Sequence, residues 1–290
     1  MASLKEIRAR INSVASTEKI TNAMKMVSAA KLKKSEGITL SFLPYRNKLN
    51  EALSNYLSSL EEAINIPLAE QRTPKKVALI GFSSSSGLCG VYNTNAIKLF
   101  RATYDDYASR IGADHVEVHL FGKKLNDYAK KNGIAVTGKH AGLGEQLNYE
   151  MASELSDTMV KRFLNHEIDE VVMVYNHFKN AGVQNPVRET VIPLATDTLA
   201  PGKSYDYLVE PSKEDFLNAL VPKVVRTKFY SIMLDTFTAE HGARMTAMHI
   251  ANDNANTLLQ ELRIQYNKAR QDVITNELID IVGGAEALNK

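Results

Sequence analysis

The chain has 290 residues, of which 44% are hydrophobic and 23% charged, and its formal net charge at pH 7 is +2. This composition supports the core of one large or two small domains and excludes a disordered protein, and the near-neutral charge does not indicate a general polyanion binder. One cysteine, Cys89, excludes an intrachain disulfide and fits a reducing compartment. No apolar run approaches the roughly 18 residues of a membrane-spanning helix, and helical spacing starts at Leu4 without a signal segment. We expect a soluble, cytoplasmic protein of bacterial type.

The first predicted element is a long helix. Between Ser3 and Lys34 the sequence has no Gly or Pro and is rich in good helix formers. Pro44 is expected to kink or end this helix, and a second apolar stripe then continues as far as the loop near Ile66. The spacing predicts an apolar seam in two parts, separated by a phase slip of one residue: Leu4, Ile7, Ile11 and Val14, then Ile20, Ala23, Val27 and Ala30.

This N-terminal segment is also basic. Up to Glu36 it holds eight Lys and Arg residues and three Glu residues, so it is expected to need acidic partners. A nucleic-acid-binding helix is therefore one alternative function, although the segment lacks interleaved aromatic residues. Salt-sensitive retention on DNA would identify it.

The central segment, residues 75–200, alternates between short apolar runs and helical patterns, which predicts an α/β domain. Two prolines place the last extended piece at a sheet edge. We expect a Rossmann-like, mostly parallel α/β domain, inserted between an N-terminal arm (1–66) and a C-terminal helix (212–290). The predicted strands are 77–80, 116–121, 134–137, 170–175 and an edge piece 186–194, and the predicted helices are 93–110, 123–132 and 149–166.

An α/β domain suggests an enzyme, but the expected motifs are incomplete. In the turn-rich stretch from Gly81 to Leu88 the second glycine comes one residue late for a phosphate-binding loop, and Leu88 replaces the required lysine. His115 and His119 read as polar residues on an exposed strand face, and Cys89 reads as a small packed residue with no neighbouring histidine. We therefore predict no catalytic residue, no metal ligand and no cofactor. An α/β enzyme with a coiled-coil arm remains an alternative that ATP binding by the purified protein would support.

The C-terminal region predicts a very long helix. Ser212 can cap it, with Asp215 completing a capping box, and Gly283-Gly284 is the expected stop. At about 1.5 Å per residue an unbroken helix from Lys213 to Val282 would be roughly 105 Å long. We expect it to form an antiparallel coiled coil with the N-terminal helix, the alternative being two ordinary amphipathic helices on a globular body. Nine positions form its predicted seam: Met245, Met248, Asn252, Ala255, Leu259, Leu262, Tyr266, Ala269 and Val273.

Several blocks of this sequence resemble the gamma subunit of bacterial F-type ATP synthases. At the N-terminus these are Lys19-Ile20-Thr21 and Met24-Lys25-Met26-Val27, and in the centre Gly87-Leu88-Cys89-Gly90. The C-terminal blocks are Asp206-Tyr207-Leu208 with Glu210-Pro211, Ala243-Arg244-Met245, Asp253-Asn254-Ala255, Tyr266-Asn267-Lys268-Ala269-Arg270-Gln271 and the stretch from Ile274 to Ala285. The chain departs from the family at Ser85-Ser86, where members often carry a charged pair.

The resemblance implies a non-catalytic central rotary shaft at the cytoplasmic face of the bacterial membrane. It would couple ion-driven rotation of the c ring to ATP synthesis or hydrolysis in the beta subunits, with alpha, beta, epsilon and c subunits as partners. The implied contacts with catalytic subunits are Met24, Lys25, Arg270, Gln271 and Thr275. Leu278, Ile281 and Val282 would form an apolar bearing at the tip, and Tyr45, Tyr207 and Leu208 would belong to a foot on the c ring or epsilon.

Overall fold

The computed structural model describes residues 3–58, 66–140, 148–195, 209–210 and 212–288. Contacts between Cα atoms divide the chain into two compact units. Residues 28–244 form one unit, here called the body, and residues 1–27 with 245–290 form the other, here called the terminal unit. Each unit is described separately below.

Helix α1 (Leu4–Ser58) begins with a capping box and passes through Pro44. The Glu6 amide donates to Ser3 Oγ (3.3 Å) and the Ser3 amide donates to Glu6 Oε2 (2.8 Å). Pro44 is expected to kink or end the helix, and the second of these outcomes is wrong because α1 continues to Ser58. Pro44 lies on the exposed side of α1, as does Leu40, whose carbonyl lacks its usual amide donor and can be hydrated.

The predicted N-terminal seam is correct in its first part and wrong in its second. Ile20 is 60% exposed and Val27 is 58% exposed, so the proposed phase slip does not occur. The original spacing continues instead, and it buries Thr21, Ser28, Leu32 and Ser35. The Thr21 and Ser35 hydroxyls donate to carbonyls one turn back in α1, to Glu18 at 2.9 Å and Leu32 at 2.8 Å, and this satisfies their polar groups inside the seam.

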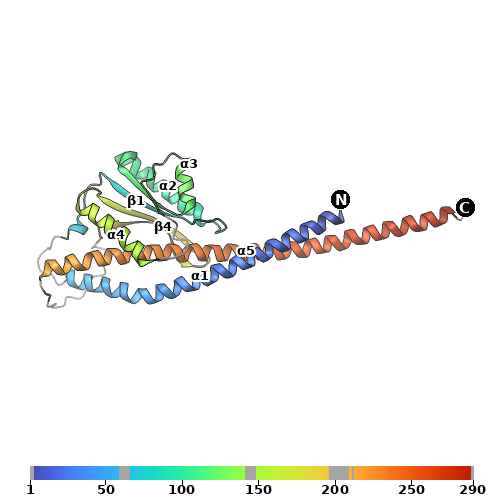
Figure 1. Ribbon diagram of the computed structural model, residues 1–290, viewed down its shortest axis with the longest axis horizontal. Coiled ribbons are helices and arrows are strands. Elements are labelled where there is room, and N and C mark those ends of the chain that lie inside the picture. The colour runs from blue at the N-terminus through green and yellow to red at the C-terminus, as the bar shows by residue number, and fades with distance from the viewer. Residues whose placement is uncertain (1–2, 59–65, 141–147, 196–208, 211, 289–290) are drawn as a thin grey trace. The chain divides into compact units, whose positions relative to one another are not determined.

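In the terminal unit, α1 and α5 (Lys213–Leu288) pair antiparallel (Figure 1). Asn252 is buried in this pair, and its Nδ2 donates to the Glu18 carbonyl (3.2 Å) and side chain (3.1 Å). The predicted seam on α5 is buried from Met248 to Leu262. Val273, at its predicted end, is 40% exposed, so the buried part of the seam is shorter than predicted.

Helix α5 starts as the sequence predicts and ends later. Ser212 Oγ accepts from the Asp215 amide (3.1 Å) and donates to the Asp215 carboxylate (2.7 Å). The helix then continues through Gly283-Gly284 to Leu288, so the predicted glycine stop is wrong. In the described part of the chain no helix combines the length and apolar character needed to cross a membrane.

The described body contains a five-stranded sheet in the order β3-β2-β1-β4-β5. Its three pairings among β1 to β4 are parallel. Strand β5 lies at the edge, as its prolines predicted, and pairs antiparallel with β4. The expected mostly parallel α/β fold is confirmed. The strands are β1 (Val77–Phe82), β2 (Val116–Phe121), β3 (Gly138–His140), β4 (Glu170–Asn180) and β5 (Val183–Ile192). The shorter helices are η1 (Pro67–Ala69), α2 (Tyr92–Ile111), η2 (Ala113–His115), α3 (Lys123–Lys131) and α4 (Tyr149–Leu164).

The strand predicted at 134–137 is displaced to β3. Gly133, with φ +67°, turns the chain after α3, and the Ile134 amide then donates to the Ala129 carbonyl (3.0 Å). Ile134 is buried against the sheet as part of this turn. The sequence pattern predicted a strand at Ile134 because its side chain is apolar, but this residue is buried in a turn and not in a strand.

Helices cover both faces of the sheet (Figure 1). On one face, α2 and α3 supply Phe100, Tyr107, Leu125 and Ala129 to a buried core. On the other face lie α4 and the body segments of α1 and α5, and this larger core contains Phe229, which is fully buried. The body segments of the two long helices are thus part of its folded core, and that segment of α5 lies directly against the domain inserted before it.

Candidate functional site

The carboxyl edge of the parallel strands is filled by the protein itself. Parallel α/β sheets usually bind ligands in the crevice beyond these strand ends. Here the loop after β1 leads to Cys89 and Tyr92, which pack in one buried cluster with Ala239 and Ala243 of α5. The Tyr92 hydroxyl also donates to the Thr236 carbonyl (3.3 Å). A ligand crevice of the usual kind is therefore replaced by a contact between the sheet and α5.

A polar network fixes this loop. Asn93 Nδ2 donates to Ser84 Oγ (2.8 Å) and Cys89 Sγ (3.0 Å), and Asn93 Oδ1 accepts from the Ser84 amide (3.0 Å). Cys89 is 2% exposed, which confirms its reading as a packed cysteine. The fixed loop presents Leu88 and Val91, whose side chains are 62% and 67% exposed, and Leu88 holds φ +62°. Sequence reasoning missed these two residues because apolar side chains in a loop are normally read as core.

A buried ion pair on α5 holds the same loop. Arg244 Nη1 donates to Glu240 Oε1 (2.8 Å), and Arg244 Nη2 donates to Ser86 Oγ (2.9 Å). Burial raises the pKa of the Glu240 carboxyl, and the neighbouring Arg244 charge opposes that shift. A serine hydroxyl thus provides a neutral acceptor for Arg244 at the position where the sequence departs from the related family.

The histidine prediction needs correction. His115 is an exposed residue of η2, whereas His119 is buried in β2, so the two do not share an exposed strand face. Within the described residues both His119 ring nitrogens lack a hydrogen-bond partner, and the ring stacks on His140 at 5.8 Å between centroids. Burial and the nearby His140 lower the pKa of His119 to about 4. In the described ranges no group of three or more His, Cys, Asp or Glu residues could hold a metal ion.

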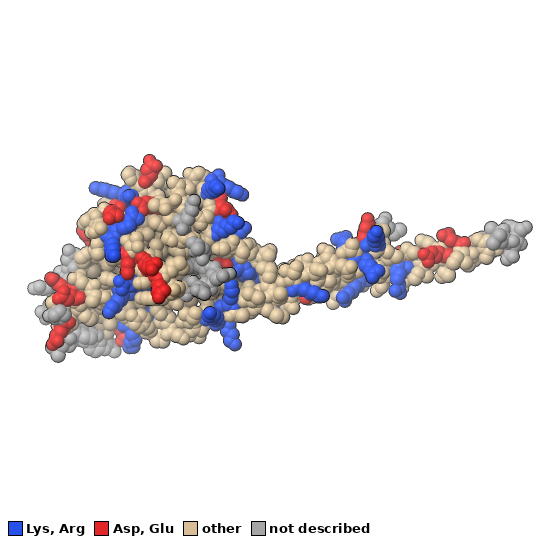
Figure 2. All heavy atoms as spheres, in the orientation of Figure 1, with Lys and Arg blue, Asp and Glu red and all other residues tan. Residues whose placement is uncertain are grey.

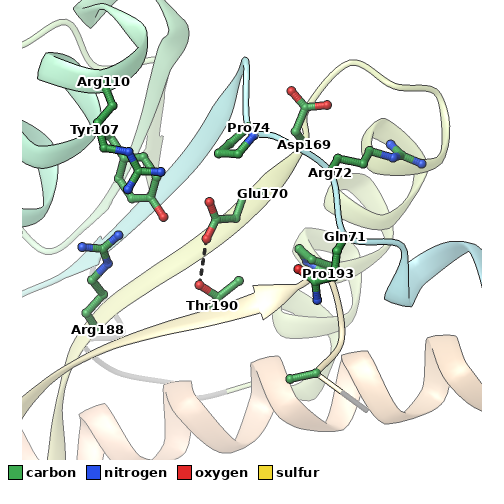
Figure 3. Close-up of a pocket in the computed structure, with 11 residues that line it drawn as sticks. Gln71, Arg72, Pro74, Tyr107, Arg110, Asp169, Glu170, Arg188, Thr190 and Pro193 are labelled. Atoms are coloured by element: carbon green, nitrogen blue, oxygen red, sulfur yellow. Dashed lines mark hydrogen bonds between the residues drawn. The ribbon is translucent and has the colours of Figure 1, made fainter. Parts of the chain in front are cut away.

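The opposite edge of the sheet contains a polar cavity of about 370 Å³ (Figure 3). Arg110 and Arg188 lie over the Tyr107 ring, at 5.1 and 4.7 Å from its centroid, and both guanidinium groups contact Asp106. On its floor, Thr190 donates to Glu170 (2.8 Å). The two arginines are paired with Asp106, and among the described residues that line the cavity there is no serine, cysteine or histidine nucleophile.

The five predicted contact residues lie on two helices of the terminal unit and do not form one cluster. Met24 and Lys25 are half-buried on α1, and the other three are exposed on α5: Arg270, Gln271 and Thr275. Since Asn252 lies against Glu18 in an antiparallel pair, Met24 lies beside residues before Asn252. It is therefore separated from Arg270 by at least 18 residues of α5, or about 27 Å.

The end of α5 exposes apolar side chains on a bare helix. Leu278, Ile281 and Val282 are 57%, 68% and 60% exposed, and every described side chain from Arg270 to Val282 is exposed. Figure 2 shows basic side chains followed by acidic ones toward the C-terminal end of this helix. A helix with exposed apolar residues all round indicates a surface that a partner covers.

The foot residues can be placed only in part. Tyr45 of α1 is 52% exposed, whereas Tyr207 and Leu208 lie outside the described residues. The foot therefore stays a prediction.

Comparisons with known proteins agree with one another over almost the whole chain. A family model described as ATP synthase matches residues 3–288. The ATP synthase gamma chain of Flavobacterium johnsoniae is 46% identical over 290 residues, covering 100% of both chains. That of Bacteroides fragilis strain ATCC 25285 is 44% identical over 292 residues, covering 99% of this chain and all of its own.

Solved structures share the fold. A chain of the Euglena gracilis mitochondrial ATP synthase, solved with its F1 sector and c ring, has a TM-score of 0.67 at 18% identity and covers 98% of this chain and 94% of its own. A chain of the Tetrahymena thermophila mitochondrial ATP synthase central stalk and c ring has a TM-score of 0.59 at 22% identity, covering 80% of this chain and 99% of its own.

Proposed function

The chain belongs to the ATP synthase gamma-chain family, and we propose that the exposed residues of its terminal unit are the surfaces through which it drives the catalytic subunits. The protein itself is the non-catalytic central rotary shaft of the F-type ATP synthase. It couples rotation of the c ring to sequential conformational change at the beta subunits, and its partners are the alpha and beta subunits, epsilon and the c ring.

The observation that carries the proposal is the bare apolar end of α5. Leu278, Ile281 and Val282 expose most of their surface to solvent in the isolated chain. A collar of alpha and beta subunits would remove this surface from water while forming few directional bonds, as a bearing requires. Arg270 and Gln271, also exposed, would add charge-assisted and amide hydrogen bonds to acidic or polar partner groups.

Torque transfer requires an asymmetric shaft. Each beta subunit meets a different side of the terminal unit, and the difference in contact free energy shifts that subunit between its open and closed states. Met24 and Lys25 on α1 and Thr275 on α5 would give the sides of the shaft different chemistry.

We further propose that the protein is peripheral, at the cytoplasmic face of a bacterial membrane. Tyr45, Tyr207 and Leu208 would then form its foot toward the c ring or epsilon. We propose the arm, inserted domain and C-terminal helix at 1–66, 75–200 and 212–290 as the functional division of the chain. The enzyme alternative gains no support, because the α/β crevice is filled by the chain itself. The nucleic-acid alternative concerns the basic N-terminal helix, and salt-sensitive retention on DNA is its test.

The direct test is reconstitution with the cognate alpha and beta subunits, with a bead attached to the body. ATP-driven stepwise rotation of the bead is expected. Hydrolysis by the purified chain alone, or failure to enter the alpha-beta ring, would contradict the shaft function.

Met24 offers a test of one contact. Met24→Arg is expected to lower ion-driven ATP synthesis about tenfold, since about 1.4 kcal/mol of lost differential contact energy has that effect. The measurement is ATP synthesis by the complex in sealed vesicles, with assembly checked by gel filtration. Ala9→Arg, at an exposed position of the same helix, is the control. Undiminished coupling in Met24→Arg would remove Met24 from the contact surface.

A further inference from the structure

Two ion pairs attach α5 to different parts of the body. Arg226 forms a bidentate pair with Asp157 of α4, with Nε–Oδ1 at 2.6 Å and Nη2–Oδ2 at 3.0 Å. Two residues later, Lys228 pairs with Glu189 of β5. Glu189 is itself held by the Tyr175 hydroxyl of β4, which donates to it at 2.8 Å. Both cations therefore reach carboxylates on elements far away in the sequence.

These pairs lie on opposite flanks of the helix. With 3.6 residues per turn, positions that differ by two residues, such as 226 and 228, are about 200° apart around the axis. Turning α5 about its axis in one direction therefore stretches the Asp157 pair, and turning it in the other direction stretches the Glu189 pair. Together the two ion pairs therefore resist rotation of α5 about its axis in both directions.

Two more polar contacts repeat this arrangement further along α5. Arg244, five whole turns after Arg226, returns to the same flank and donates to Ser86. Asp235 lies on the Lys228 flank, where its carboxylate accepts from the Phe178 amide (2.9 Å) and contacts His177 Nδ1 (2.6 Å). Each flank thus carries at least two directional contacts along the body segment of α5, and Arg46 of α1 adds another near the Lys228 flank by donating to Ser231 Oγ (2.9 Å).

The apolar core cannot supply this resistance alone. Hydrophobic burial between α5 and the sheet is non-directional, so it opposes separation more than sliding. Charge-assisted hydrogen bonds have fixed geometry and oppose a change of angle. In a shaft, torque must pass between the body and the continuous helix α5 that leads to the terminal unit.

We propose that Arg226 and Lys228 are positioning residues that lock α5 to the body against twisting, so that torque is transmitted with little angular lag. This proposal rests on the shaft function. The side chains of both pairs are 28–41% exposed, so the pairs contribute little to folding. Their mechanical role can therefore be separated from stability.

The test uses the assembled alpha-beta-gamma complex, with a bead attached through Ser109→Cys on α2. Native Cys89 is buried, so the new thiol is the accessible one. The angular variance of the bead is measured while the motor pauses at low ATP. In Arg226→Gln/Lys228→Gln the variance is expected to rise about twofold, because one charge-assisted contact is removed from each flank. The hydrolysis rate and the melting temperature of the complex are expected to stay unchanged.

Two further variants make the result specific. Arg101→Gln removes an exposed ion pair with Asp105 within α2 and should leave the variance unchanged. The charge swap Arg226→Asp/Asp157→Arg, made with Lys228 intact, should give less variance than Arg226→Asp alone. Unchanged variance in the double Gln variant of a rotating complex would overturn the lock, as would a rise accompanied by a lower melting temperature. A complex that does not rotate even with the native residues would instead contradict the shaft function.

Discussion

Glu240→Ala is expected to lower the free energy of unfolding of the body by about 3–5 kcal/mol. The substitution leaves the Arg244 guanidinium, whose residue is 6% exposed, without its carboxylate partner. The remaining contacts of Arg244 are with the hydroxyl and carbonyl of Ser86, and neither neutralises a charge. Because Arg244 also holds the loop of Leu88, the same change should loosen that loop.

The measurement is urea denaturation followed by tyrosine fluorescence, which suits a chain with 12 Tyr and no Trp. The matched control is Glu240→Ala/Arg244→Leu, which removes both charges and is expected to cost less than the single change. Hydrogen exchange of the amides from Ser84 to Val91 reports the loop. Equal losses in the single and double variants would show that the pair acts through packing and not through charge.

Much of the fold follows from local patterns in the sequence. The apolar runs at β1, β2 and β4, the prolines that place β5 at an edge and the cap at Ser212 all act within a few residues. The errors occur where tertiary context decides. Thr21 and Ser35 look like surface residues, yet their hydroxyls are satisfied within α1 and can be buried.

Local sequence signals also fail to predict where the two long helices end. Pro44 and Gly283-Gly284 are strong local stop signals, but both helices continue through them. Packing of the neighbouring α1 residues Leu53 and Tyr56 in the body core outweighs the local cost at Pro44. The continuation through the two glycines has no packing explanation in the described residues.

The candidate site divides in a similar way. The family resemblance supplied the predicted contact residues on α5. These residues are exposed, which is compatible with contact to a catalytic subunit. The contact of Arg244 with Ser86 joins positions 158 residues apart, and no local pattern reports it. The burial of His119 was missed for a related reason: β2 is a central strand covered on both faces, so a polar residue on it need not face solvent.

Lowering the pH from 7.5 to 5.0 is expected to destabilise the body, because two buried histidines stay neutral in the folded state. Burial and His140 lower the pKa of His119 to about 4, and burial, Arg244 and Lys31 lower that of His241 to about 4. In the unfolded chain both titrate near 6.5. Between pH 6.5 and 4 the unfolded state therefore binds more protons, and stability falls as the pH falls.

The size of the effect follows from linkage. At pH 5.0 each histidine contributes a loss of up to about 2 kcal/mol relative to pH 7.5. The acid that faces His119 does not interfere in this range. Glu117, whose Oε2 lies 4.0 Å from His119 Nε2, has its pKa lowered to about 2, mainly by Arg162, so the stability it provides is lost only below its ordinary pKa of 4.5. Burial raises the pKa of Glu240 beside His241, so the folded state binds a proton on this carboxyl more readily than the unfolded chain, which offsets part of the loss. The Glu240→Ala/Arg244→Leu variant reports that contribution separately.

Urea denaturation at pH 7.5 and 5.0 tests the assignment residue by residue. His119→Leu and His241→Leu, which cannot titrate, should each reduce the difference in unfolding free energy between the two pH values by up to about 2 kcal/mol. His115→Leu is the control, because His115 is exposed in η2 and should leave the difference unchanged. If all three variants keep the native pH difference, the histidines are charged or hydrated in the folded body, and the acid sensitivity must come from carboxylates.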